Sequence, residues 1–153
     1  MIFWRITTAK WALDKLCEGA RANGGRWNPV GLPAMYAGTT VEICALEKFV
    51  HLAGSAYPPL KLVSIEVPDD TSLITHPKTS SLPVDWSDLP MSASAQEYGR
   101  QWLTSQTQLI LLVPSVIVPE STNAVINPLH PAYKDVRLKI IRDFTFDARM
   151  FKP

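Results

Sequence analysis

Apolar and polar residues along this chain follow short periods that predict a mixture of strands and helices. Residues 60–67 and 136–140 alternate between apolar and polar positions, which is typical of a half-buried strand. A continuous apolar run at residues 109–113 has the length of a fully buried strand. The expected strands cover residues 2–6, 34–37, 60–67, 109–113 and 136–140, and residues 116–118 would extend the fourth beyond Pro114.

Three helices are expected between these strands. Residues 9–17 carry apolar side chains at helical spacing. The other two should begin with a capping box, in which a Thr or Ser caps the first turn and a Glu three residues later reaches back to its amide. One starts at Thr39 with Glu42 and ends near Ala53 before Gly54; the other starts at Ser94 with Glu97 and ends near Ser105. Because strands and helices do not alternate strictly, we expect an α+β fold with a mixed or antiparallel sheet.

The length and composition indicate one compact domain over residues 1–153. Apolar residues make up 46% and charged residues 19%, which is enough to form a core. The formal net charge of +1 argues against a nucleic-acid binder that relies on a basic surface. No apolar run is long enough to span a bilayer, no signal peptide is evident, and two unpatterned cysteines suit a reducing cytoplasm. Three scattered histidines and these cysteines lack the spacing of metal ligands.

Two long connecting segments stand out. Residues 19–33 hold four glycines, two prolines, Arg21 and Arg26, and loops of this length in small domains are often functional. Residues 68–91 form a polar connector that carries no recognisable motif.

Glu47 lies at the edge of the apolar face of the helix expected from Thr39, one turn before His51. It is compatible with an ordinary polar pair on a boundary face. The alternative is a carboxylate that lines a pocket and works while partly shielded from water. The helix pattern alone does not separate these interpretations.

Three further residues allow both a structural and a functional interpretation. Arg26 follows two glycines, so it is either a surface Arg stacked on Trp27 or the guanidinium of an anion site that the backbone approaches closely. Tyr36 is either a core tyrosine or a ring that flanks a planar ligand. Ser115 follows the most apolar run, so it is either a turn serine or a residue at the strand end where sheet proteins place ligands.

Taken in order, a set of short motifs in this chain resembles the RES domain, the toxin half of bacterial RES–Xre toxin–antitoxin pairs. The resemblance extends from residue 2 to residue 151. The family is named for an Arg, a Glu and a Ser, which match Arg26, Glu47 and Ser115, with Tyr36 as a fourth pocket residue. The motifs are Trp4-Arg5-Ile6, Gly25-Arg26-Trp27-Asn28 with Gly31 and Pro33, Tyr36-Ala37, Ala45-Leu46-Glu47, Val113-Pro114-Ser115 and Asn127-Pro128-Leu129-His130-Pro131.

The resemblance implies a fold related to the ADP-ribosyltransferases and a cytoplasmic enzyme that breaks the bond between nicotinamide and ribose in NAD, by hydrolysis or with phosphate as acceptor. NAD is then the substrate, and neither a metal nor another cofactor is needed. The implied partners are an Xre-type antitoxin and a second toxin copy within a larger complex. DNA would be contacted only through the antitoxin, and no membrane is involved.

The chemistry of NAD cleavage suits these residue types. Glu47 would stabilise the cationic character that develops on the ribose, and Arg26 would bind the pyrophosphate. Tyr36 would stack on the nicotinamide or its ribose, and Ser115 would hydrogen-bond either group. Arg5 is a candidate for a second phosphate contact.

Three alternatives remain open at this level. The same pocket would serve an ADP-ribosyltransferase that modifies a cellular protein instead of activating water. An RNA-cleaving toxin would use His51, Glu47 and Arg26 on a phosphodiester, although the near-neutral charge argues against it. The third alternative is a non-catalytic binding module; the presence of Arg26, Glu47 and Ser115 together argues against it, because binding alone does not require this set.

Overall fold

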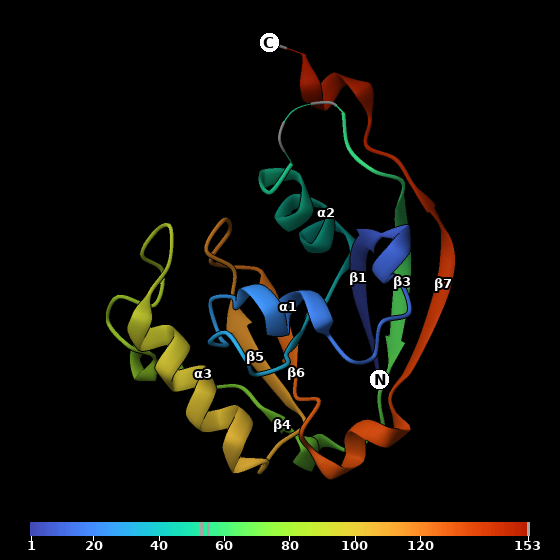
Figure 1. Cartoon of the computed structure of the whole chain (residues 1–153). Coiled ribbons are helices and arrows are strands. Elements are labelled where there is room, and N and C mark those ends of the chain that lie inside the picture. The colour runs from blue at the N-terminus through green and yellow to red at the C-terminus, as the bar shows by residue number, and fades with distance from the viewer. Residues whose placement is uncertain (53, 55, 153) are drawn as a thin grey trace.

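A computed structural model describes residues 1–52, 54 and 56–152 and shows a seven-stranded sheet with helices packed against it (Figure 1). The strand order is β4-β5-β6-β2-β1-β3-β7, and every described pair is antiparallel except β4 with β5. The expectation of an α+β fold with a mixed sheet is therefore confirmed. The strands are β1 (Ile2–Thr8), β2 (Met35–Gly38), β3 (Leu60–Glu66), β4 (Ile74–Thr75), β5 (Ile110–Pro114), β6 (Thr122–Ile126) and β7 (Arg137–Phe144).

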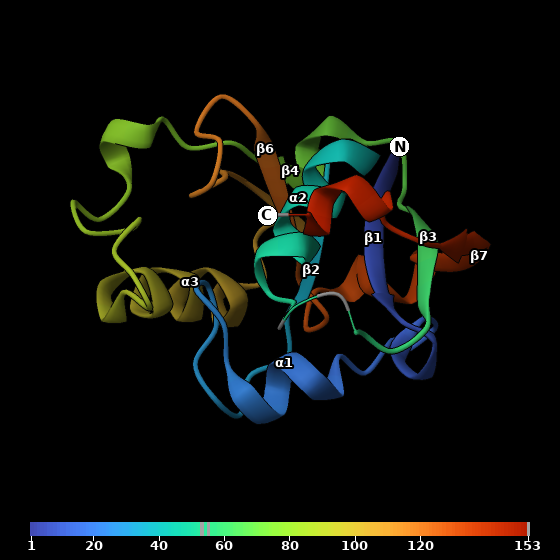
Figure 2. The ribbon, with the colours of Figure 1, turned by 90° about the horizontal axis from the view of Figure 1, so that it is seen from above.

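Helices flank this sheet, and short 3-10 turns connect several of the strands. Seen from above, α2 lies near the centre of the molecule, between α3 on one side and strands β1 and β3 on the other (Figure 2). The C-terminal turn packs on α2, where the rings of Phe151 and Phe49 have centroids 5.3 Å apart. The helices are α1 (Glu18–Asn23), α2 (Val41–Val50) and α3 (Ala93–Ser105), and the 3-10 turns are η1 (Ala9–Trp11), η2 (Thr71–Leu73), η3 (Thr79–Ser81), η4 (Pro131–Asp135) and η5 (Ala148–Phe151).

The sheet consists of two groups of strands joined at a narrow seam. Strand β1 pairs with β3 along its whole length, and β2 pairs with β6 along its whole length. Between β1 and β2, in contrast, the register contains the single pair Trp4 with Gly38. Figure 1 shows β5 and β6 on one side of the molecule and β1, β3 and β7 on the other. The seam lies beneath α2, so α2 bridges the two halves of the sheet.

Apolar residues gather in three clusters around this frame. One cluster, which includes Phe3, Met35 and Ile126, covers the sheet face opposite α2. The other two share the α2 face: Ile6, Cys44 and Phe146 belong to the cluster beneath α2. Trp27, Trp102 and Val125 belong to the cluster beneath α3. The domain therefore buries both faces of its sheet, which suits the apolar fraction of the chain.

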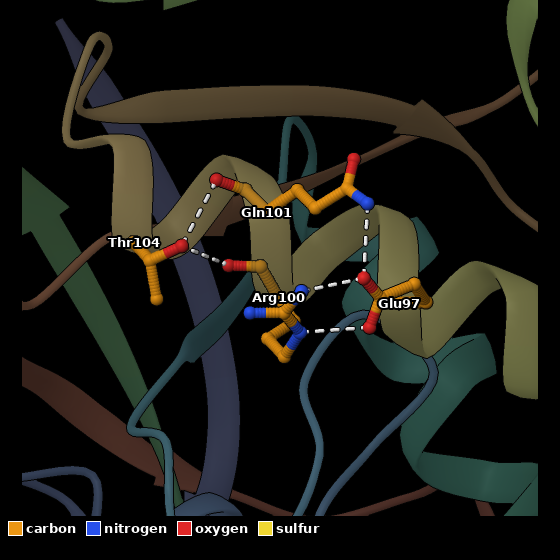
Figure 3. Close-up of polar contacts among 4 residues, drawn as sticks. All are labelled: Glu97, Arg100, Gln101 and Thr104. Carbon is orange, nitrogen blue, oxygen red and sulfur yellow. Dashed lines mark hydrogen bonds and ion pairs between the residues drawn. The ribbon is translucent and has the colours of Figure 1, made fainter.

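Helix α3 presents one buried and one polar face. Ala95, Gly99, Trp102 and Leu103 point inward. On the outer face Arg100 donates to both oxygens of Glu97, at 2.7 and 2.6 Å, as Figure 3 shows. This pairing lowers the pKa of Glu97 to about 2. The expected capping box is therefore wrong: Ser92 caps α3 by accepting from the Ala95 amide, and Glu97 pairs forward along the helix instead of reaching back.

The cap of α2 differs by one residue from the expectation. Thr40, rather than Thr39, accepts from the amide of Ile43. The helix ends at Val50 with His51 as its C-cap. The expected end near Ala53 lies outside the described residues, while Gly54 has a φ of +91°, a conformation that favours glycine.

The helix expected over residues 9–17 is wrong, and part of the expected loop is a helix instead. Leu13 and Leu16 are 55% and 69% exposed, so their helical spacing does not mark a buried face. The Asp14 carboxylate accepts from the amides of Leu16 and Glu18, which favours a turn over a continuing helix. Cys17 then adopts a left-handed φ of 54°, and α1 begins directly after it at Glu18 and occupies the first part of the predicted loop 19–33.

The expectation for the second half of the sheet was incomplete. Residues 116–118 do not extend β5; they lie in a turn, and the chain returns as β6. The connector at residues 68–91 contributes the short parallel strand β4 at the sheet edge. Within the described part of the chain, no helix is long and apolar enough to cross a membrane.

Candidate functional site

Glu47 is carried by α2, whose position above the sheet depends on a glycine. A Cβ atom at Gly38 would lie 2.6 Å from the Cys44 sulfur and 2.7 Å from the Ile43 side chain. The bare backbone of β2 therefore lets α2 approach closely, and Cys44 donates to the Trp4 carbonyl oxygen at 3.0 Å. This close packing brings Glu47, half-buried, over strands β2 and β6.

Two side chains from the β5–β6 hairpin donate to the Glu47 carboxylate. Ser115 donates through Oγ to Oε1 of Glu47 at 2.8 Å, and Asn123 donates through Nδ2 to the same oxygen at 2.5 Å. Among the residues that the structure describes, none donates to Oε2. The carboxylate is thus anchored through one oxygen, and its other oxygen is available for a further interaction.

Ser115 is fully buried behind this carboxylate, with an exposed fraction of 0%. Its hydroxyl accepts from the amides of Ile117 and Val118, at 3.0 and 3.2 Å, while its proton goes to Glu47. A hydroxyl offers one proton and two lone pairs, so all three are already in use. The arrangement gives Ser115 a place in holding Glu47, whereas the expected contact with nicotinamide or ribose stays a prediction.

Tyr36 spans from β2 to the glycine-rich loop that follows α1. Its hydroxyl donates to Oδ1 of Asn28 at 2.7 Å and accepts from the Trp27 amide at 2.9 Å. Burial raises the pKa of this hydroxyl well above its ordinary value, so it stays protonated and keeps its donor role under alkaline conditions as well as at neutral pH. A Cβ atom at Gly25 would lie 2.5 Å from the hydroxyl oxygen, which explains the glycine at this position.

Arg26 stands at the tip of the same loop, and it is half-buried. Its Nη1 donates to the carbonyl oxygens of Trp86 and Asp88, at 2.7 and 2.9 Å. The neighbouring Trp27 ring stacks on Trp86, with centroids 6.3 Å apart and planes at 18°. Trp27 therefore stacks on Trp86, while Arg26 bonds to backbone carbonyl oxygens; no stack of Arg26 on Trp27 is present among the described residues.

The strand register brings Glu47 and the Arg26 loop to the same face of the sheet. Gly38 lies opposite Asn123 and Tyr36 lies opposite Val125, and residues directly opposite each other share a face. Tyr36 is two residues from Gly38, so its ring and the Asn123 side chain lie on that face as diagonal neighbours. Asn123 holds Glu47, and Tyr36 holds the loop of Arg26. Four residues predicted from the sequence, Arg26, Tyr36, Glu47 and Ser115, thus belong to two hydrogen-bonded groups on the same face of β2 and β6.

Arg5 has no hydrogen bond to this group among the described residues, although its charge acts on Lys48 of α2. Trp4 opposes Gly38, so alternation along β1 directs Arg5 to the other sheet face, with Phe3. One of its guanidinium nitrogens is buried and has no partner among the described residues. Its charge adds to burial in lowering the pKa of Lys48. A phosphate contact for Arg5 stays a prediction.

Asn123 is the residue that the sequence did not reveal. It lies in a polar segment, residues 119–123, which lacks the apolar alternation of a strand and which we did not expect to pair with β2. Only the register of β6 shows that its side chain faces α2. No group of three or more His, Cys, Asp or Glu residues that could hold a metal occurs within residues 1–52, 54 and 56–152.

The architecture is therefore that of an α+β domain in which a helix-borne carboxylate and an arginine loop lie on the same face of the sheet. The sequence matches the RES domain family over residues 2–147, and the chain belongs to this family. It is 41% identical over 155 aligned positions to the Prs ADP-ribosylating toxin of Sphingobium sp. (strain YBL2), covering 98% of this chain and 96% of the relative.

Further similarity supports the same family and fold. The chain is 34% identical to Toxin Res of Yersinia enterocolitica, over 98% of this chain and 99% of the relative. Among solved structures, a chain of the M. tuberculosis MbcT–MbcA toxin–antitoxin complex superposes with a TM-score of 0.71 at 24% identity, covering 94% of this chain and 84% of that one. At this identity the structural match shows the shared fold.

Proposed function

We propose that this protein is the toxin of a toxin–antitoxin pair and that it depletes NAD by cleaving the bond between nicotinamide and ribose. The relatives named as toxins, which match nearly the whole chain, support the first part. The observation that supports the second is that Glu47, bonded through Oε1 to Ser115 and Asn123, and the Arg26 loop, bonded to Tyr36, lie on one face of β2 and β6. A carboxylate and a guanidinium so arranged suit the ribose and the pyrophosphate of a dinucleotide.

The proposed reaction uses the free oxygen of Glu47. As the bond to nicotinamide breaks, the bonding electrons leave with the ring, which departs neutral, and positive charge develops on the ribose. The Glu47 carboxylate stabilises this charge and accepts a hydrogen bond from a ribose hydroxyl. Water then adds to the ribose carbon and loses a proton, which yields ADP-ribose. Phosphate as the acceptor would give ADP-ribose 1″-phosphate by the same route.

Arg26 and Tyr36 would orient the substrate. A guanidinium bonded to phosphate oxygens contributes about 1.5–3 kcal/mol, so one Arg suffices without a strongly basic surface. Tyr36 would bring its ring face to the nicotinamide or its ribose, while its hydroxyl keeps the loop in place. No step requires a metal or a second cofactor.

A second candidate is transfer of ADP-ribose to a cellular protein. The relative at 41% identity is named an ADP-ribosylating toxin, and this favours a protein acceptor over water. The chemistry at Glu47 would be unchanged, because only the group that attacks the ribose differs. NAD carrying a label in its adenylate half separates the two: free labelled ADP-ribose supports hydrolysis, and labelled protein in a lysate supports transfer.

The partner proposed for this toxin is an Xre-type antitoxin that binds DNA for the complex, with a second toxin copy in the assembly. The loop at residues 19–33 carries Arg26, so an antitoxin that covers it would block the site. Co-expression of the toxin with its neighbouring reading frame and mass determination of the purified complex test the partner and the stoichiometry.

The direct test of the proposed activity is incubation of the purified protein, freed of any partner, with NAD. Chromatography should show release of nicotinamide together with ADP-ribose, or with ADP-ribose 1″-phosphate in phosphate buffer. Unchanged NAD with water, phosphate and a cell lysate supplied in turn as acceptor would overturn the proposal.

A further inference from the structure

Both hydrogen bonds to the Glu47 carboxylate end on the same oxygen, and they come from different places in the β5–β6 hairpin. Ser115 follows β5, whereas Asn123 lies within β6. We propose that Asn123 is a positioning residue of this site: with Ser115 it fixes Oε1 of Glu47, so that Oε2 is the one oxygen offered to the substrate. This inference rests on the proposed function, because it assigns the oxygen that would act on the ribose.

A single donor would not fix the carboxylate. Ser115 is held by the amides of Ile117 and Val118, so its hydroxyl defines one point near Oε1. A carboxylate bonded at one point still rotates about that bond. The amide of Asn123 adds a second point from the neighbouring strand, and two donors on one oxygen restrict the orientation of the whole group.

The reach of Asn123 depends on the glycine opposite it. Gly38 pairs with Asn123, and its missing side chain allows Cys44 and Ile43 of α2 to lie against the strand. The helix is therefore close enough to β6 for Nδ2 to meet Oε1 at 2.5 Å. A larger residue at position 38 would lift the helix and separate this pair, so Gly38 and Asn123 act together in placing Glu47.

The test compares Asn123→Ala and Asn123→Asp with the wild type in NAD turnover. Asn123→Ala removes one charge-assisted hydrogen bond, and we expect kcat to fall about 10- to 100-fold while KM for NAD changes less than about threefold. Circular dichroism and thermal melting establish that each variant is folded. Gln106→Glu, an exposed amide-to-carboxylate change beyond the end of α3, is the matched control and should keep wild-type turnover.

The pH dependence of NAD turnover by Asn123→Asp distinguishes a positioning role from a merely structural one. Two adjacent carboxyl groups share one proton, and the protonated Asp can then donate as the Asn amide does. At higher pH both groups ionise and repel each other. Turnover by this variant should therefore fall as the pH rises from about 5 to about 8, relative to wild type and Gln106→Glu.

The outcomes separate this inference from the proposed function. Absence of NAD cleavage by the wild type with every acceptor would overturn the proposed function, and this inference with it. Wild-type cleavage, with folded Asn123→Ala retaining the wild-type kcat or Asn123→Asp retaining the wild-type pH profile, would overturn this inference alone. A lowered kcat for Asn123→Ala together with loss of Asn123→Asp turnover at higher pH would support it.

Discussion

The Nη1 atom of Arg26 lies 2.7 Å from the carbonyl oxygen of Trp86 and donates to it. This bond, together with a second one to the Asp88 carbonyl, ties the glycine-rich loop to the segment that leads into α3. Arg26 is therefore a structural link as well as the guanidinium proposed to bind phosphate. Its Nε and Nη2 have no partner among the described residues, so phosphate oxygens can be bound without breaking the link.

Replacement of Arg26 should weaken NAD binding more than it slows the reaction. In Arg26→Ala we expect KM for NAD to rise about 10- to 100-fold, because a charge-assisted contact to the pyrophosphate is lost, with a smaller change in kcat. Steady-state kinetics and calorimetry with NAD measure this. Arg21→Ala, an exposed arginine of the same segment with a long 3.8 Å contact to Glu18, is the control. Unchanged NAD affinity in folded Arg26→Ala would reject the pyrophosphate assignment.

The hydroxyl of Tyr36 should contribute to stability even without substrate. Tyr36→Phe leaves Oδ1 of Asn28 and the Trp27 amide without their partner, and we expect the free energy of unfolding to fall by about 1–3 kcal/mol. Urea denaturation measures the change. Tyr98→Phe serves for comparison, because the Tyr98 hydroxyl has no hydrogen bond within the described chain. Equal stability of the two variants would contradict the role given to the Tyr36 hydroxyl.

Gly99 of α3 should not tolerate a side chain. A Cβ atom there would lie 1.9 Å from the Trp27 carbonyl oxygen, so Gly99→Ala must move the loop that carries Arg26. We expect a loss of about 1–3 kcal/mol in stability and reduced NAD turnover. Gly19→Ala is the opposite case: it lies in α1, has no atom within 4 Å of the added carbon, and should gain up to about 1 kcal/mol. If thermal melting ranks the two variants the other way, the described packing of α3 on the loop is wrong.

The buried thiol of Cys44 should make stability sensitive to alkaline pH. Burial is the main cause that raises the pKa of Cys44 to about 12 in the folded protein, from an unfolded value of 9.0. Between pH 9 and 12 the unfolded state therefore holds fewer protons than the folded state, and stability falls as the pH rises through this window. Urea unfolding from pH 7 to pH 11 should show this decline, and Cys44→Ala should make it less steep, because Tyr36 and Tyr133, whose pKa values burial also raises, still contribute. If the free energy of unfolding depends on pH identically in Cys44→Ala and in the wild type, the raised pKa assigned to Cys44 is wrong.

The strands that carry strong apolar patterns were predictable, because their side chains alternate or form continuous runs. β3 and β5 were located to within one residue at each end. β6 was missed since its first residues, Thr122 and Asn123, are polar and partly exposed, so the strand lacks an apolar alternation at its start. The α-helix expected over residues 9–17 does not form, because the Asp14 carboxylate accepts from two backbone amides and favours a turn. The spacing of apolar residues gives no sign of this capping.

The candidate site was only partly predictable. Glu47, Arg26, Tyr36 and Ser115 were selected by residue type and by the order of their motifs. Their mutual positions come from the register of β2 with β6 and from the close approach of α2 over Gly38, neither of which a single sequence specifies. The roles of Arg26 and Ser115 in tying segments together became visible only from their hydrogen bonds.

The most direct test of the central claim is NAD turnover by Glu47→Gln, measured as nicotinamide released by the purified protein beside the wild type. The amide keeps the size of the side chain and removes the negative charge that would stabilise the ribose cation, so we expect turnover to fall by at least about 100-fold with the fold intact. Nicotinamide release by folded Glu47→Gln at the wild-type rate would contradict the account.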